Sequence, residues 1–242
     1  MSDNVGVLFC GGEGTRMRPL TYYLQKVMMP IGADQIPLLE YVIKHFKKHN
    51  INDLILLVNY KKEQIQGYFG DGERWGVNLT YIPDKPGLKG TGTALLNAES
   101  FIKERRMIIY YTDIITNVNL SEMLSFHDQH KKWATILLSK GWQIRVGTAE
   151  TDEENHITKF VEKPILPLLV NTGISILEPS IFDHLKGFEP NQSVDLSKDI
   201  FPYFVQKGKI IAYTQEDCFW EDIGSIERYE RLDHEKITEL MK

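Results

Sequence analysis

Short apolar runs alternate with amphipathic stretches along the first half of the chain. Residues 54–58 (LILLV) and 107–111 (MIIYY) are continuous apolar runs, which is typical of strands buried on both faces of a sheet. Residues 37–50 place apolar side chains at helical spacing, with lysines on the opposite face. Further strands are expected at 7–9 and 77–82, and further helices at 61–72 and 92–103. This succession predicts an α/β fold with a Rossmann-like, mixed but mainly parallel sheet flanked by helices.

The second half of the chain is richer in strand-like segments. Strands are expected at 133–139, 144–150, 157–162, 170–177 and 210–214. The last segment, residues 225–242, has the spacing of one amphipathic helix. Neither an internal repeat nor a low-complexity linker interrupts the pattern, which favours a single domain over residues 1–242.

Composition and charge narrow the class of protein. The 242 residues are 42% hydrophobic and 25% charged, as in ordinary globular proteins. The net charge of −5, without a long basic block, argues against a nucleic-acid partner. Apolar runs are too short to span a bilayer, so no membrane partner is expected. Cys10 and Cys218 are far apart and lack metal-ligand spacing, so we expect free thiols and a cytoplasmic location.

A glycine-rich turn follows the first strand, in the stretch GVLFCGGEGTRMRPLT at residues 6–21. Gly11, Gly12 and Gly14 leave room for backbone N–H groups to converge on an anion, and Thr15 and Arg16 follow at once. Met17 stands where a dinucleotide-binding loop needs its third glycine, and the Walker spacing is absent. The residues predict a loop that holds phosphates, with a plain surface turn as the alternative.

The string GGEGTRMRPLT, followed by Lys26 in QKVMMPIG, resembles the opening of the sugar-1-phosphate nucleotidyltransferases. The resemblance implies that this loop holds a nucleoside triphosphate, with Arg16 at the leaving phosphates and Lys26 near the α-phosphate, both as catalytic cations. Because QKV departs from the family's usual PKP, a solvated Lys26 is the alternative. Arg18 has two interpretations, a phosphate contact or a pair with a surface carboxylate.

Two aspartates are candidate metal ligands. Asp113 follows the apolar run 107–111, at the carboxyl end of a predicted strand, where ligands gather in such sheets. Asp222, in FWEDIG, resembles the family's second metal ligand. Two carboxylates with phosphate oxygens suit Mg²⁺, which is the expected cofactor. A turn-forming Asp113 and a helix-capping Asp222 are the alternatives.

Several further strings resemble the parts of the family that hold the sugar phosphate. TKFVEKP at residues 158–164 matches FxEKP, in which the glutamate bonds sugar hydroxyls and the lysine, also a catalytic cation, grips the phosphate. VNTGISILEP at residues 170–179 matches the strand that faces the sugar. Through this resemblance the sugar-phosphate contacts are expected at Gly147, Glu162, Lys163, Asn171, Thr172, Gly173 and Trp220. A core role for Trp220 is the alternative.

LKGTGTALLNA at residues 88–98 resembles the family segment that approaches the base or ribose, which adds Gly90 and Thr91 to the nucleotide-binding residues. Capping of the following helix by Thr91 or Thr93 is the structural alternative. The base is expected to be read around residues 84–90. The pattern leaves thymidylyl, uridylyl and guanylyl transfer open, together with the identity of the sugar.

The resemblance therefore implies Mg²⁺-dependent transfer from a nucleoside triphosphate to a sugar 1-phosphate, giving an NDP-sugar and pyrophosphate. It implies a nucleotide-binding lobe at about 1–120 and a sugar-binding lobe at about 121–242, with no C-terminal β-helix. A homo-oligomer is expected because many relatives form dimers or tetramers. The alternative is a catalytically weak, NDP-sugar-binding regulatory subunit, suggested by Thr112 in the place of the family's usual glycine.

Overall fold

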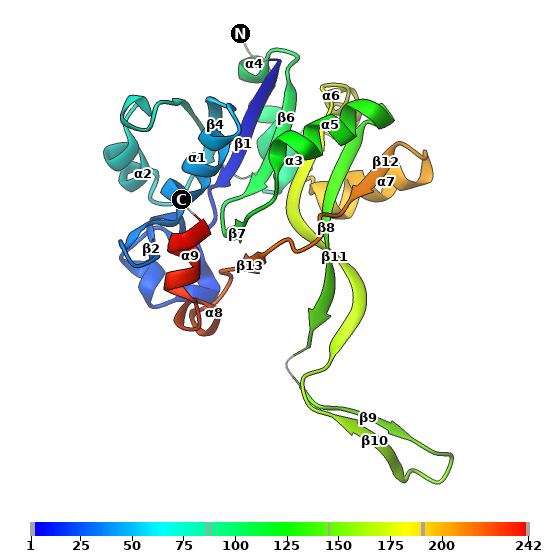
Figure 1. The fold of residues 1–242 in the computed structure, drawn as a ribbon. Coiled ribbons are helices and arrows are strands. Elements are labelled where there is room, and N and C mark those ends of the chain that lie inside the picture. Colours follow the sequence, from blue (N-terminus) through cyan, green and yellow to red (C-terminus); the bar gives the residue numbers. More distant parts are fainter. Residues whose placement is uncertain (1–2, 86, 88, 145, 190–191, 241–242) are drawn as a thin grey trace.

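The fold is built on a central seven-stranded sheet (Figure 1). The computed structural model describes residues 3–85, 87, 89–144, 146–189 and 192–240. In spatial order the strands are β12 (Ile210–Tyr213), β8 (Ala134–Gln143), β11 (Ile165–Leu177), β6 (Arg106–Tyr111), β1 (Asn4–Cys10), β4 (Asp53–Val58) and β5 (Asn78–Pro83). Only β11 pairs antiparallel with its neighbours in this sheet. The predicted mixed, mainly parallel sheet is confirmed.

Helices cover both faces of the sheet, and each face has its own apolar core. One core includes residues from α1 (Leu38–Lys48), α2 (Lys62–Phe69), α5 (Leu120–His130) and α9 (His234–Leu240). The other includes residues from α3 (Thr91–Asn97), α4 (Glu99–Ile102), α6 (Ile181–Leu185) and α7 (Phe201–Gln206). Strand β1 divides its side chains between them, because Val5 and Val7 face one core and Leu8 and Cys10 the other. The continuous apolar runs thus mark strands buried on both sides.

The C-terminal segment returns to the first half of the chain. Strand β13 (Trp220–Asp222) pairs antiparallel with β7 (Ile114–Thr116), the strand that begins directly after Asp113. Two short helices follow, α8 (Ile226–Glu230) and α9, where the sequence predicted one long helix. Tyr229 donates its hydroxyl proton to the Pro30 carbonyl at 2.7 Å, which fixes this return. The pairing of β13 with β7 brings Asp222 opposite Ile114, next to Asp113.

Strands β8 and β11 continue past the sheet as an antiparallel ribbon, which carries β9 (Thr148–Thr151) and β10 (Ile157–Val161) at its far end (Figure 1). We call residues 139–144 and 146–170 the arm. In Figure 1 the arm projects away from the sheet and its helices. Every residue of β10 is exposed. The sequence predicted separate strands at 133–139 and 170–177, but the structure extends both outward into one ladder.

The remaining short elements shape the loops around the sheet. The segment after β1 holds three single-turn helices, η1 (Thr15–Met17), η2 (Leu20–Tyr22) and η3 (Lys26–Met28), and then the hairpin of β2 (Pro30–Ile31) and β3 (Ile36–Pro37). Two more turns are η4 (Glu73–Trp75) and the π-helical η5 (Leu196–Ile200). In the described part of the chain, none of the helices has the length and apolar character that a bilayer crossing requires.

Candidate active site

A cavity of about 450 Å³ opens at the carboxyl ends of β1, β4 and β6. Its lining includes six of the predicted residues, namely Gly11, Gly12, Lys26, Gly90, Thr91 and Asp113. Asp84 and Asn59 also line it, directly beside Gly11, where a Cβ would lie 2.9 Å from the Asp84 carboxylate. Burial raises the pKa of the Asp84 carboxyl, while the hydrogen bond from Asn59 opposes the shift. The glycine loop and the start of α3 thus face one space, as the nucleotide-binding prediction requires.

Gly14 shapes the loop from outside this cavity. Its φ of +61° is a left-handed conformation that glycine adopts without cost. A Cβ here would lie 2.8 Å from Thr21 and 3.3 Å from the Cβ of Lys26, so the absent side chain lets these segments approach. Thr21 also donates its hydroxyl proton to the Gly14 carbonyl at 2.9 Å. Thr15 begins η1 beyond this turn, outside the cavity lining.

Gln25, which sequence reasoning did not single out, ties the loop together. Its side chain is 1% exposed. Its amide nitrogen donates to the Cys10 carbonyl at 2.7 Å, and its amide oxygen accepts from the Val27 N–H at 2.5 Å. One buried side chain therefore joins the end of β1 to the turn that carries Lys26. The replacement of the family's usual proline by Gln25 was the only sequence signal for this role.

Lys26 and Asp113 form an ion pair at the floor of the cavity. The Lys26 Nζ lies 2.5 Å from Asp113 Oδ2, and the lysine side chain is 13% exposed. This burial excludes the solvated loop lysine that the sequence left as an alternative. Arg18, in contrast, pairs with the surface carboxylate of Glu13 at 3.0 Å, which agrees with the second of its two interpretations.

A second cavity, of about 380 Å³, adjoins the first at Tyr111 and Asp113. The predicted residues in its lining are Arg16, Asp113, Asn171, Thr172, Gly173, Trp220 and Asp222. Trp220 donates its indole N–H to the Thr172 carbonyl at 2.9 Å, which holds the ring against β11. The Thr172 hydroxyl points to β8 instead, where it donates to the Leu137 carbonyl at 2.9 Å. Seven predicted residues from four separated segments therefore meet here.

The two carboxylates in this cavity fit a divalent cation. Asp222 Oδ1 is buried and makes no hydrogen bond to any described residue, while Oδ2 pairs with Arg228. A Cβ on Gly224 would lie 2.6 Å from that Oδ1, so a larger residue at this position would displace the carboxylate. The described residues contain no cluster of three or more metal-ligating side chains. Mg²⁺ does not need one, because it takes few carboxylates and completes its shell with water and phosphate oxygens.

The start of α3 lies against the η5 segment. Thr91 donates its hydroxyl proton to Asp195 at 3.2 Å and accepts from the Leu196 N–H at 2.9 Å. The residue that precedes the helix is Gly90, with no side-chain cap, so the structural alternative, capping by Thr91 or Thr93, is wrong. The predicted base-reading segment contains residues 86 and 88, which lie outside the described residues.

Three predicted sugar-phosphate residues lie outside both cavities, on the arm. The Lys163 Nζ lies 3.7 Å from Glu162 Oε1, and a Cβ on Gly147 would lie 2.9 Å from the Glu162 carboxylate. The structure thus groups Gly147, Glu162 and Lys163 with each other but not with Asp113 and Trp220. Their contact with a sugar phosphate stays a prediction.

Thr112, which stands where the family usually has glycine, is one of the residues that line the first cavity. Its hydroxyl donates to the Phe9 carbonyl at 2.6 Å, and only 2% of the residue is exposed. The hydroxyl of Thr112 is therefore hydrogen-bonded to the neighbouring strand, β1. Beside it, burial raises the pKa of the Cys10 thiol to about 12, so this cysteine stays protonated and is no nucleophile.

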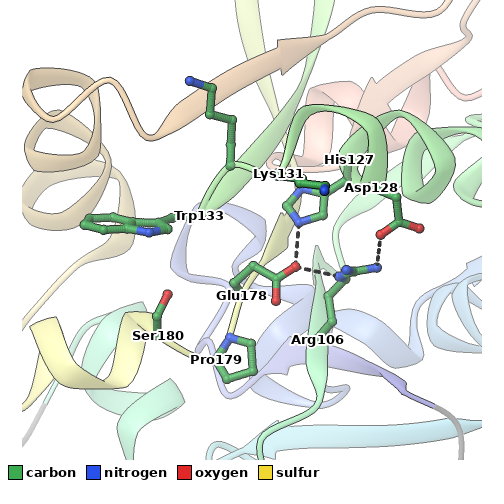
Figure 2. Close-up of a pocket in the computed structure, with 9 residues that line it drawn as sticks. Arg106, His127, Asp128, Lys131, Trp133, Glu178, Pro179 and Ser180 are labelled. Atoms are coloured by element: carbon green, nitrogen blue, oxygen red, sulfur yellow. Dashed lines mark hydrogen bonds and ion pairs between the residues drawn. The ribbon is translucent and has the colours of Figure 1, made fainter.

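Figure 2 shows another cavity, of about 500 Å³, at the opposite end of the sheet. Glu178 accepts a hydrogen bond from His127 at 2.9 Å and pairs with Arg106 at 2.8 Å, and Arg106 also reaches Asp128. The His127 bond, followed by Arg106, lowers the pKa of Glu178. Because Arg106 begins β6 and Asp113 follows it, this network lies at the far end of β6 from the site. His127 is buried and takes part in this network rather than in the site.

The comparisons with known proteins agree with this geometry. The family described as nucleotidyl transferase matches residues 5–239. The chain is 28% identical to a mannose-1-phosphate guanylyltransferase of Mycobacterium tuberculosis, over 93% of this chain and 62% of that protein. It is 30% identical to a UTP–glucose-1-phosphate uridylyltransferase of Synechocystis, over 92% of this chain and 61% of that protein. The chain thus spans about three fifths of the length of these curated relatives.

A solved structure shares the fold. It is that of a Bacillus anthracis protein assigned as a glucose-1-phosphate thymidylyltransferase, in complex with sucrose. The TM-score is 0.78 at 22% identity, with 94% of this chain and 93% of that chain covered. Together with the family match over nearly all residues, the cavities at the carboxyl ends of the strands settle the classification. The chain belongs to the nucleotidyl transferase family, the family of the sugar-1-phosphate nucleotidyltransferases that its sequence resembles.

Proposed function

We propose that this chain transfers a nucleotidyl group from a nucleoside triphosphate to a sugar 1-phosphate, giving an NDP-sugar and pyrophosphate. The observation that carries the proposal is the junction of two cavities at Asp113 and Tyr111. One cavity is walled by the glycine loop and Lys26, and the other by Arg16, Trp220 and β11. Two phosphorylated substrates in adjoining spaces would meet at this junction.

The reaction needs alignment and charge more than proton transfer. A phosphate oxygen of the sugar 1-phosphate attacks the α-phosphorus, a new P–O bond forms, and the bond to the β-phosphate oxygen breaks as pyrophosphate leaves. The attacking oxygen is already ionised at neutral pH, so no protein base is required. Lys26 and Arg16 would stabilise the negative charge that spreads over the phosphates in the transition state. The arrangement of fixed cations around a shared junction supports such in-line transfer.

Asp113 and Asp222 are proposed to hold Mg²⁺. When bound, the ion supplies positive charge to the phosphate oxygens and helps to orient them. Lys26 pairs with Asp113 and Arg228 pairs with Asp222 Oδ2, while the buried Asp222 Oδ1 makes no hydrogen bond to any described residue and could accept the ion. The free thiols of Cys10 and Cys218 suit a reducing compartment, which supports the cytoplasm as the proposed location.

The test is pyrophosphate release with Mg²⁺ over a grid of substrates. ATP, GTP, CTP, UTP and dTTP are each combined with the 1-phosphates of glucose, mannose, N-acetylglucosamine and heptose. One clearly preferred pair supports the enzyme and names its product, which the guanylyl- and uridylyltransferase relatives leave open. No release from folded protein that still binds an NDP-sugar, measured by calorimetry, would refute the proposal and favour a regulatory subunit.

A further inference from the structure

The arm carries three predicted sugar-phosphate residues away from the cavity of its own chain. Asn171 lines that cavity, and Ile165 precedes it by six residues on the same strand, β11. At the rise of a β-strand, about 3.3 Å per residue, this places Ile165 about 20 Å from Asn171. Glu162 and Lys163 come before Ile165, still further out along the chain. Of the described residues that line the second cavity, Arg16 is the only cation.

Backbone pairing holds the arm in this extended position. The ladder between β8 and β11 runs from the pair of Ala134 and Leu177, inside the sheet, to the pair of Gln143 and Ile165, on the arm. To turn Lys163 back toward its own cavity, the ribbon would have to bend sharply at one of the two register shifts of this ladder, between Leu166 and Leu169 or between Asn171 and Ser175, and lose backbone pairs there. Each exposed backbone group would then need a new partner. The geometry therefore favours a target for the arm outside its own chain.

The surface of the arm is apolar where a solvated ribbon should be polar. Seven of the thirteen large hydrophobic side chains that are exposed in the described residues lie on it. They are Val146, Ile157, Phe160, Val161, Ile165, Leu168 and Leu169. Ile165 is 70% exposed and Phe160 63%. A concentration of this kind marks an interaction surface, and a two-stranded ribbon alone in water is marginally stable, so the arm needs a cover.

The part of the chain outside the arm also has an exposed apolar patch, which lies near the site. Leu20, Tyr22 and Tyr23 are 37%, 55% and 80% exposed. They belong to the turn η2 and its end, in the segment that connects Arg16 to Lys26. An arm that packs on this patch would bring its own charged residues next to the cations of the cavity. A second copy of the chain has both surfaces, so two copies related by a two-fold axis can satisfy each other.

We propose that this protein is a dimer with exchanged arms, in which each arm completes the sugar-phosphate site of the other copy. Lys163 of one copy then neutralises the sugar phosphate bound between Asp113 and Trp220 of the second copy, and Glu162 accepts hydrogen bonds from sugar hydroxyls. This inference rests on the proposed nucleotidyl transfer for its ligand, but the exchange of arms is a structural statement that can be tested without catalysis.

The decisive experiment combines two inactive variants in one dimer. Asp113→Asn and Lys163→Ala are co-expressed with different affinity tags, and mixed dimers are isolated by tandem purification. With exchanged arms, the arm of the Asp113→Asn chain, which keeps Lys163, completes the site of the Lys163→Ala chain, which keeps Asp113. One of the two sites of the mixed dimer is then intact, so about half of the wild-type rate per dimer returns. If each arm serves its own core, both sites carry a defect and the rate stays at that of the parents. Either that result or the absence of a mixed dimer overturns the proposal.

A second experiment does not depend on activity. A benzophenone photo-cross-linker is introduced at position 163, and the modified chain is irradiated. Exchanged arms predict a covalent dimer on a denaturing gel, with position 163 joined to a peptide that contains Asp113 or Asp222. A cross-link within a single chain, or a dimer linked only from arm to arm, contradicts the proposal. If the cross-link forms but no substrate pair releases pyrophosphate, the proposed function has failed and the exchange of arms stands.

The apolar cover is tested by sedimentation. Phe160→Ser with Ile165→Ser lies wholly on the exposed arm, so circular dichroism should show an intact fold. We expect this double variant to sediment as a monomer at concentrations where the wild type is a dimer. Val205→Ser is the matched control, because Val205 is 62% exposed on α7, away from the arm. A monomeric wild type, or a double variant that remains dimeric, contradicts the proposal.

Discussion

Gln25→Leu tests whether one buried amide holds the phosphate-binding loop in shape. Leucine has a similar volume, but it leaves the Cys10 carbonyl and the Val27 N–H without the bonds of 2.7 and 2.5 Å that Gln25 makes. Each buried polar group left without a partner costs about 1–3 kcal/mol, and the added apolar side chain offsets part of the total. We expect the free energy of unfolding to fall by about 3 kcal/mol.

The loss is measured by urea denaturation and by melting temperature. For a chain of this size, about 3 kcal/mol lowers the melting temperature by about 6 to 12 °C. The KM for the nucleoside triphosphate should rise as well, because the turn that carries Lys26 is no longer tied to β1. Gln66→Leu is the control, since Gln66 lies exposed on α2 and should change stability by less than about 0.5 kcal/mol. If both variants behave alike, Gln25 does not have the role assigned to it.

Three further variants probe the site and the core. Asp113→Asn should lower turnover at least about a hundredfold while circular dichroism shows an intact fold, because charge at the reaction centre is lost and the shape is kept; near-normal turnover refutes the role of Asp113. Thr112→Gly should leave kcat at or below the wild-type value, because the Thr112 hydroxyl is bonded to Phe9, so a higher kcat would show that Thr112 does obstruct the site. Burial, followed by the charge of His49, lowers the pKa of His45 from 6.5 to about 4. Between these two pH values His45 is therefore protonated in the unfolded chain but neutral in the folded chain. Stability should therefore fall by about 3 kcal/mol as the pH drops from 6.5 to 4, and His45→Gln should remove this part of the slope in denaturation measured across that range.

The strands in the first half of the chain could be predicted from the sequence because their local apolar pattern matches their burial in the fold. β1, β4 and β6 are buried on both faces, so their apolar runs identify them without knowledge of their neighbours. The same applies to Asp113, because the end of a buried parallel strand is where such a sheet places its ligands. Gln25 could not be found in this way. Its role depends on two backbone groups that only the folded turn brings within reach.

The arm shows a different limit of sequence reasoning. The expected strand at 170–177 begins after Pro167, and proline cannot donate a hydrogen bond to a ladder. The structure instead keeps the strand and absorbs the proline in a register shift between Leu166 and Leu169. A strand that continues through a bulge carries its side chains outward, whereas a strand that ends there allows the chain to turn back to the sheet.

That difference decides where Lys163 acts. A motif in the sequence can suggest which side chains a reaction uses, and the resemblance of FVEKP to the family motif implies Glu162 and Lys163. It does not state which copy of the chain supplies them, because both arrangements have the same order of residues. The ladder from Ala134 to Gln143 favours the second copy, since its pairing keeps the arm extended away from its own cavity. The exposed apolar residues of the arm then follow as a consequence, because a ribbon that serves a second copy needs a surface by which to bind it.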